Sequence, residues 1–165
     1  MVEIIETLIA NGWNYSEAKD DPNNETHFPE KIPQAIKDFW KKFEKLSSPS
    51  EVAWFFSYWD YLEMSDSAFA WNEFELNGME CAVTEDQKEL VVKFWKNHFP
   101  FAMSVKDDYK YLAIGINQKN LGQIFIGENS DEDEITLISK NMDEFLMLVR
   151  KFYRGEQNKW LTTFW

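Results

Sequence analysis

Histidine and cysteine, which most often supply nucleophiles, proton carriers and metal ligands, are scarce in this chain. Its 165 residues include two histidines, His27 and His98, and one cysteine, Cys81. Neither histidine lies near a Cys, Asp or Glu at the spacing of a metal site or a catalytic triad. Cys81 follows Glu80, and a neighbouring acid disfavours the reactive thiolate. We therefore expect no zinc site and no nucleophilic catalysis, and we expect Cys81 to be a buried thiol.

Carboxylates are abundant, but no pair of them is singled out by its spacing. Glu73, Glu75 and Glu80 lie among many aromatic residues, the combination that glycosidases use. The acidic run 131–134 lacks the spaced ligands and the glycine of a calcium loop, so it is predicted to be a solvated turn. The sequence therefore predicts a protein that is not an enzyme and binds no metal, with an unrecognised hydrolase as the remaining alternative.

The stretch 111–127, YLAIGINQKNLGQIFIG, contains glycines but does not have the pattern of a phosphate-binding loop. Its glycines are spread out and lead into a strand, whereas a phosphate loop needs closely spaced glycines before a helix. Two alternating apolar runs instead flank a polar connection that contains Asn117, Asn120 and Gly122. This pattern predicts a β-hairpin, and no cofactor is expected.

The net charge indicates which partners the chain could bind. It has 17 Lys and Arg against 29 Asp and Glu, a formal net charge of -12. This charge repels nucleic acid and anionic membranes, so we expect neither as a direct partner. It would attract a basic protein. The simpler alternative is that the acidity only keeps the protein soluble.

Several features predict a cytoplasmic protein. One cysteine cannot form an intramolecular disulfide and suits a reducing compartment. The first residues, MVEIIETLIANGW, lack the basic region of a secretory signal. No apolar stretch reaches the length needed to cross a bilayer.

The first half of the chain predicts helices and one strand. Apolar spacing indicates a helix over 2–10 that Gly12 ends, and residues 14–30 read as an exposed loop. Pro33 opens an amphipathic helix. The aromatic tract 51–75 is assigned a strand buried on both faces, and helix is the alternative for part of it. A capping box predicts a helix over 84–97. The apolar face of the Pro33 helix is formed by Ile36, Phe39, Trp40, Phe43 and Leu46.

The second half predicts a sheet followed by a helix. The strands FAMSV, 109–116 and 123–127 form an antiparallel meander, and ITLIS is a further strand. Asn141 and Glu144 start a helix, and the aromatic tail after Gly155 packs back onto the domain. Helices, then a sheet, then a helix predict an α+β fold with a central antiparallel sheet. The length predicts one domain, residues 1–165.

The order of five motifs resembles the SUKH superfamily, the Smi/Knr-like proteins, over residues 28–150. The motifs are KIPQAIKDFWKKF, FPFAMSV, DYKYLAIGI, GQIFIG and LISKNMDEFL, and FAWNEFE also resembles a segment of some members. The matching positions are Ile32, Pro33, Phe39, Phe99, Pro100, Phe101, Tyr111, Ala113, Gln123, Ile124, Phe125, Phe145 and Leu146. The resemblance implies an α+β domain with no shared catalytic residues.

The resemblance also implies a function. Many bacterial members are immunity proteins that neutralise toxins, often nucleases, and fungal relatives regulate the cell wall. We therefore expect a cytoplasmic antitoxin that occludes a basic toxin domain, with a regulatory scaffold protein as the alternative. The expected partner-binding residues are Trp71, Glu73, Glu75, Tyr109, Tyr111, Glu128, Asp131, Glu132, Asp133 and Glu134. For each of them the alternative is a solvated acid or a core aromatic.

Overall fold

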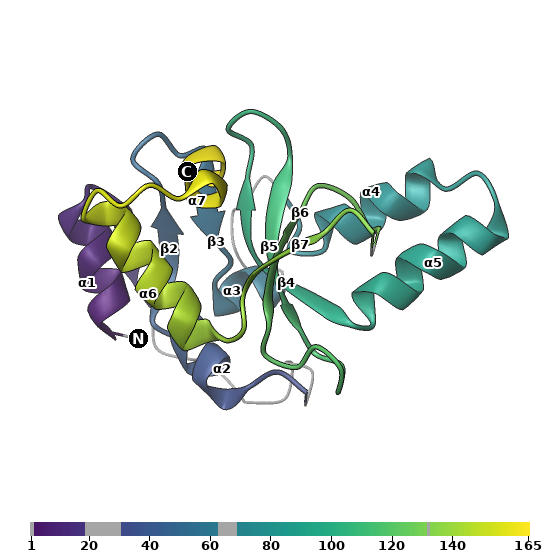
Figure 1. Ribbon diagram of the computed structural model, residues 1–165, viewed down its shortest axis with the longest axis horizontal. Helices are drawn as coiled ribbons and strands as arrows, with labels where there is room; N and C mark the ends of the chain where they lie inside the picture. The colour runs from purple at the N-terminus through teal and green to yellow at the C-terminus, as the bar shows by residue number, and fades with distance from the viewer. Residues whose placement is uncertain (1, 19–30, 63–68, 132) are drawn as a thin grey trace.

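A computed structural model of the protein describes residues 2–18, 31–62, 69–131 and 133–165. Its strands form one antiparallel sheet in which every strand pairs with its neighbours along the chain (Figure 1). The strands are β1 (Asn14–Glu17), β2 (Phe43–Ser47), β3 (Ala53–Phe55), β4 (His98–Ser104), β5 (Lys110–Gly115), β6 (Ile124–Gly127) and β7 (Thr136–Ser139). The expected α+β fold with a central antiparallel sheet is confirmed.

Helices cover both faces of this sheet. Along β5, Leu112 and Ile114 join a large apolar cluster with α1, α2, α6 and α7, whereas Tyr111 and Ala113 join a smaller cluster with α4 and α5. Because alternate residues of a strand point to opposite faces, the two clusters lie on opposite sides of the sheet. The helices are α1 (Val2–Ala10), α2 (Gln34–Trp40), α3 (Tyr58–Tyr61), α4 (Glu73–Cys81), α5 (Glu85–Trp95), α6 (Met142–Tyr153) and α7 (Lys159–Phe164).

Local signals place the starts of two helices where the sequence predicted them. At α5, Gln87 N donates to Thr84 Oγ1 at 3.3 Å and Thr84 N donates to Gln87 Oε1 at 3.1 Å, so the capping box is present. At α6, Glu144 N donates to Asn141 Oδ1 at 2.9 Å. The tail also packs back as expected, because Leu161 and Phe164 of α7 are buried.

The helix expected after Pro33 is shorter than its apolar spacing suggested. It ends at Trp40, and Phe43 and Leu46 lie on β2, where both are fully buried. Residues 43–47 have helical apolar spacing, but they form a strand because they pair with β1 on one side and β3 on the other. The loop expected over 14–30 was also wrong in part, since residues 14–17 form the edge strand β1. All four of its side chains are exposed, so no apolar alternation marked it.

The aromatic tract and the predicted order of elements need correction as well. Within the described part of the tract, residues 51–62 and 69–75, only Ala53–Phe55 is a strand. Ser57 then caps α3 through Asp60, whose backbone N donates to Ser57 Oγ at 3.4 Å. Helix α4, which follows, was not predicted. Strands and helices alternate through the first half, so the meander runs through all the strands rather than through the second half alone.

The polar connection between β5 and β6 is fixed by asparagine side chains. Asn117 N donates to Asn120 Oδ1 at 3.0 Å, and Asn120 Nδ2 donates to the Asn97 carbonyl at 3.3 Å. The same amide lies 3.0 Å from Nε2 of the buried His98, whose Nδ1 is 3.0 Å from the Phe94 carbonyl. The hairpin is confirmed, and its asparagines tie it to the start of β4.

Replacing Asn120 by alanine should destabilise the protein, because Asn117 N in the β5–β6 connection and two partners at the start of β4, the Asn97 carbonyl and the buried His98, lose their hydrogen bonds. We expect a loss of about 1–3 kcal/mol in the free energy of unfolding, measured by denaturant titration. Gln118→Ala changes an exposed side chain in the same connection and should stay within about 0.5 kcal/mol of the wild type. Equal effects of the two substitutions would contradict this account of the turn.

Candidate functional site

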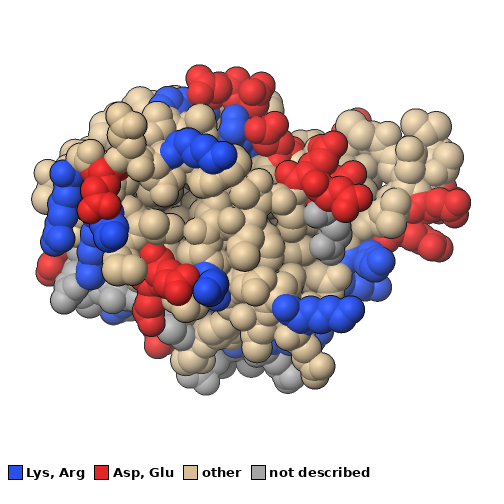
Figure 2. Space-filling model, in the orientation of Figure 1, with Lys and Arg blue, Asp and Glu red and all other residues tan. Residues whose placement is uncertain are grey.

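Two acidic turns meet at one end of the sheet. Tyr111 at the start of β5 pairs with Gly127 at the end of β6, so the β4–β5 turn and the β6–β7 turn lie side by side. Acidic side chains gather over this end of the molecule, in the upper part of Figure 2. We call the described carboxylates of these turns the acidic rim, and its members are Asp107, Asp108, Glu128, Asp131, Asp133 and Glu134.

Four of the six rim acids were predicted. Glu132 was predicted too, but it lies outside the described residues. Asp107 and Asp108 were missed, because only the pairing of β5 with β6 brings their turn next to the acidic run. The doublet Asp107-Asp108 between two predicted strands was the signal that could have indicated it.

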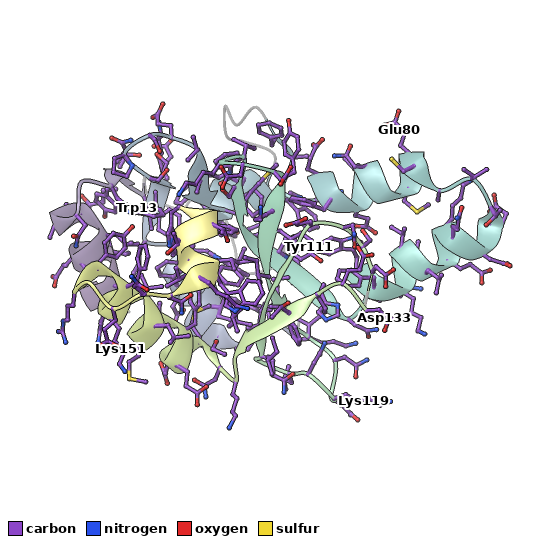
Figure 3. All side chains as sticks on the ribbon, turned by 45° about the horizontal axis from the view of Figure 1, so that its top comes forward. Trp13, Glu80, Tyr111, Lys119, Asp133 and Lys151 are labelled. Atoms are coloured by element: carbon purple, nitrogen blue, oxygen red, sulfur yellow. The ribbon has the colours of Figure 1, made fainter. Side chains whose placement is uncertain are left out.

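Hydrogen bonds within the β6–β7 turn hold its backbone in one arrangement. Asp131 N donates to Asn129 Oδ1 at 3.0 Å, and Asp133 N donates to Asp131 Oδ1 at 2.9 Å. The Asn129 side-chain amide donates to the Glu134 carboxylate. Around the turn, Asn129, Asp131, Asp133 and Glu134 are thus linked to one another by hydrogen bonds (Asp133 is labelled in Figure 3).

The turn is also anchored to the helices on the adjoining face. Ser130 Oγ accepts a hydrogen bond from Trp95 Nε1 at 2.8 Å and donates to the Phe74 carbonyl at 3.3 Å. Phe74 lies between Glu73 and Glu75 at the start of α4. The two acids predicted on α4 are therefore neighbours of the acidic rim.

The side chains of α4 differ in how far they are available to a partner. Glu73 is half-buried and accepts a hydrogen bond from Asn77 Nδ2 at 3.2 Å. Glu75 is also half-buried, and burial raises the pKa of its carboxyl above the ordinary glutamate value. Trp71 is half-buried, and its ring stacks on Phe99 with centroids 5.3 Å apart. Trp71 thus belongs largely to the packing beneath the surface.

The two tyrosines predicted to flank a groove have opposite environments. Tyr109 is exposed at the β4–β5 turn, with 56% of its surface accessible. Tyr111 is fully buried, so its prediction as a contact residue was wrong. The Tyr111 hydroxyl donates to the Asn129 carbonyl at 2.6 Å, and its ring packs against Phe74. Tyr111 therefore links the acidic turn to the apolar core.

A hollow of about 190 Å³ lies beside the rim, between the β6–β7 turn and α7. Its polar walls include Glu128, Glu134 and Lys110, and Trp160 of α7 supplies an aromatic wall. Lys110 Nζ lies 3.3 Å from Glu128 Oε1 and 3.9 Å from Asp108 Oδ2. The sequence placed Trp160 on the domain but did not assign it to this site.

The residue types that could do chemistry do not converge. Across residues 2–18, 31–62, 69–131 and 133–165, no three His, Cys, Asp or Glu side chains are arranged to hold a metal ion. Cys81 is exposed on α4, so the prediction of a buried thiol was wrong; the arm formed by α4 and α5 extends beyond the sheet there (Figure 1). His27 lies outside the described residues. What the arrangement offers is a rigid anionic surface.

No helix within the described ranges is long and apolar enough to span a membrane.

Comparison with protein families identifies a matching family. The model of the SMI1 / KNR4 family (SUKH-1) matches residues 24–148, a segment that includes α2, the sheet from β2 to β7 and the acidic rim. No curated protein and no solved structure matches the chain significantly. Because the family match covers most of the chain, this protein belongs to the SMI1 / KNR4 family (SUKH-1).

Proposed function

We propose that this protein is a cytoplasmic immunity protein that binds a basic toxin domain through the acidic rim. It neutralises the toxin by covering its active surface and performs no reaction of its own. The observation that carries this proposal is the rim itself, six carboxylates on two adjacent turns at one end of the sheet.

The lysines near the rim leave its negative charge largely uncompensated. Lys106 Nζ donates to the carbonyls of Thr162 and Trp165 at 2.7 and 2.8 Å, so its amine is turned toward the C-terminal helix. The Lys110 side chain is only 11% exposed and lies between Asp108 and Glu128. With six carboxylates against these two amines, the rim remains net negative.

A surface of this kind acts mainly on the rate of association. Exposed charges interact over roughly 8 Å at physiological ionic strength, and clustered charges of one sign steer an oppositely charged partner during its approach. A nuclease that binds nucleic acid carries positive charge around its active site, because it has to attract phosphates. Carboxylates on a fixed turn can occupy the same positive site and exclude the substrate.

Family membership supports this role in its coarser form. The SUKH resemblance implies toxin immunity for many bacterial members, and the family also includes regulatory proteins. A regulatory scaffold is the competing function, and the neighbourhood of the gene distinguishes the two. A neighbouring gene for a large secreted protein with a C-terminal toxin domain supports immunity, whereas an isolated gene supports the scaffold.

Reversing two rim charges should slow binding of the toxin domain encoded beside this gene. In the variant Asp107→Lys with Asp133→Lys, both positions are exposed and neither carboxylate takes part in the hydrogen bonds of the turn described above. We expect the association rate constant to fall at least about tenfold at low ionic strength, because steering depends on local charge. Stopped-flow fluorescence measures this rate.

The matched control is Glu6→Lys with Glu17→Lys, which changes the net charge equally on the exposed surface of α1 and β1. At the same ionic strength its association rate should stay within about threefold of the wild type, because these charges lie on α1 and β1, away from the rim, and Coulomb attraction weakens with distance. Equal slowing in both variants would show that net charge, and not the rim, attracts the partner. An unchanged rate in the rim variant would remove the rim from the interface.

Neutralisation should require one copy of this protein for each toxin molecule. Occlusion leaves the toxin chemically intact, so residual toxin activity should fall linearly with added protein and reach zero at equal concentrations. Titration of toxin activity at concentrations well above the dissociation constant measures this. Complete neutralisation by a small fraction of an equivalent, or a covalent change in the toxin mass, would instead indicate an enzyme.

A further inference from the structure

Helix α4, in the arm that extends away from the sheet (Figure 1), has a glycine in its interior. Glycine is among the least favourable residues at such a position. A Cβ at Gly78 would lie 2.9 Å from Ser130 Oγ and 3.1 Å from a Val91 methyl group of α5. The first distance is shorter than real Cβ atoms show. Alanine at this position would therefore force Ser130 to move.

Ser130, in the β6–β7 turn, lies in the space beside Gly78 and joins both helices of the arm. Its hydroxyl accepts a hydrogen bond from Trp95 Nε1 at 2.8 Å and donates to the Phe74 carbonyl at 3.3 Å. Phe74 and Gly78 belong to α4, and Trp95 is the last residue of α5. We call Phe74, Gly78, Trp95 and Ser130 the arm junction.

The backbone is held on both sides of Ser130. The Tyr111 hydroxyl donates to the carbonyl of Asn129, the preceding residue, and the Tyr111 ring packs on Trp95 with centroids 5.1 Å apart. On the other side, Asp131 N donates to Asn129 Oδ1 at 3.0 Å. A displacement of Ser130 is therefore passed on to the residues next to it.

Three acids of the rim follow Ser130 within four residues, namely Asp131, Asp133 and Glu134. Asp133 is hydrogen-bonded to Asp131, and Glu134 accepts a hydrogen bond from the Asn129 amide. The attraction between two charges weakens with distance, and a binding group works best when neighbouring residues hold it in place. A shift of Ser130 would thus displace these acids while leaving their charge unchanged.

We infer that Ser130 is a positioning residue of the acidic rim, and that the arm supports the rim through it. The inference rests on the proposed binding of a toxin domain by the rim. Ser130 acts through the acids that follow it: its place beside Gly78 determines where Asp131, Asp133 and Glu134 lie. The charge of the rim attracts the partner, and the arm junction determines how well the bound groups fit.

The test measures association and dissociation separately, with the toxin domain encoded beside this gene. Ser130→Ala removes the hydroxyl and keeps every rim carboxylate, so the association rate at low ionic strength should stay within about threefold of the wild type. The dissociation rate should rise at least about fivefold, because displaced carboxylates form poorer ion pairs. A loss of stability alone would not produce this difference between the two rates of the folded protein.

Gly78→Ala alters the same junction from the arm. Its Cβ displaces Ser130 Oγ without changing any atom of the turn, so dissociation should again be at least about fivefold faster, although alanine favours the helix. The double variant should exceed the larger single effect by no more than about twofold, because both changes act on one junction. The matched control is Leu76→Ala on the same helix, where the side chain is 51% exposed; its rates should stay within about twofold of the wild type.

The indole N–H of Trp95 reports on the arm junction without any partner. Its NMR signal should shift in Ser130→Ala and in Gly78→Ala, because both variants remove its hydrogen bond to Ser130, and it should stay in place in Leu76→Ala. A wild-type indole signal in Gly78→Ala would show that Ser130 does not depend on the glycine, and the inference would be wrong.

The outcomes distinguish failure of the inference from failure of the proposed function. If Asp107→Lys with Asp133→Lys slows association but Ser130→Ala and Gly78→Ala dissociate at the wild-type rate, the rim binds the toxin and the arm junction does not position it. If the charge-reversed variant associates at the wild-type rate, the rim is not the interface, and the inference falls together with the proposed function.

Discussion

The alignment of β5 with β6 is the constraint on which the surface of this protein depends. Tyr111 pairs with Gly127, and the tyrosine hydroxyl lies so close to that glycine that a side chain there would collide with it. The same hydroxyl donates a hydrogen bond to the Asn129 carbonyl in the acidic turn. The buried Tyr111 thus contributes to both the alignment of β5 with β6 and the position of the acidic turn. The position of the surface carboxylates therefore depends on how the core packs.

Besides the helices that cover both faces of the sheet, the molecule presents two distinct surfaces, the acidic end of the sheet and the arm. The sheet end presents short, hydrogen-bonded turns whose acids need little rearrangement on binding, and preorganised groups lose less entropy when a partner docks. The base of the arm meets this end through Ser130, which is hydrogen-bonded to both arm helices. Charge acts mainly on how fast partners meet, whereas the fit of contacting groups acts mainly on how long they stay together. The charge of the rim and the placement of its acids therefore suit different steps of recognition.

The sequence predicted elements whose signals are local. Thr84 and Asn141 marked helix starts through capping side chains, and alternation marked the central strands. The predictions were wrong where pairing between distant strands determines the structure. Phe43 and Leu46 continue a helical spacing but lie on a strand, and Tyr111, an aromatic with a polar tip, suited a surface yet is buried. Four of the six rim acids followed from the acidic run in the sequence, while Asp107 and Asp108 required knowledge of which turns meet.

The arm is part of the connection between β3 and β4, two strands that pair directly with each other. Their pairing closes the sheet independently of how far the connecting helices extend. Insertions, deletions and replacements in the outer half of the arm therefore leave strand registers untouched. Such a layout makes the outer half of the arm a place where the chain can change in length without losing its fold.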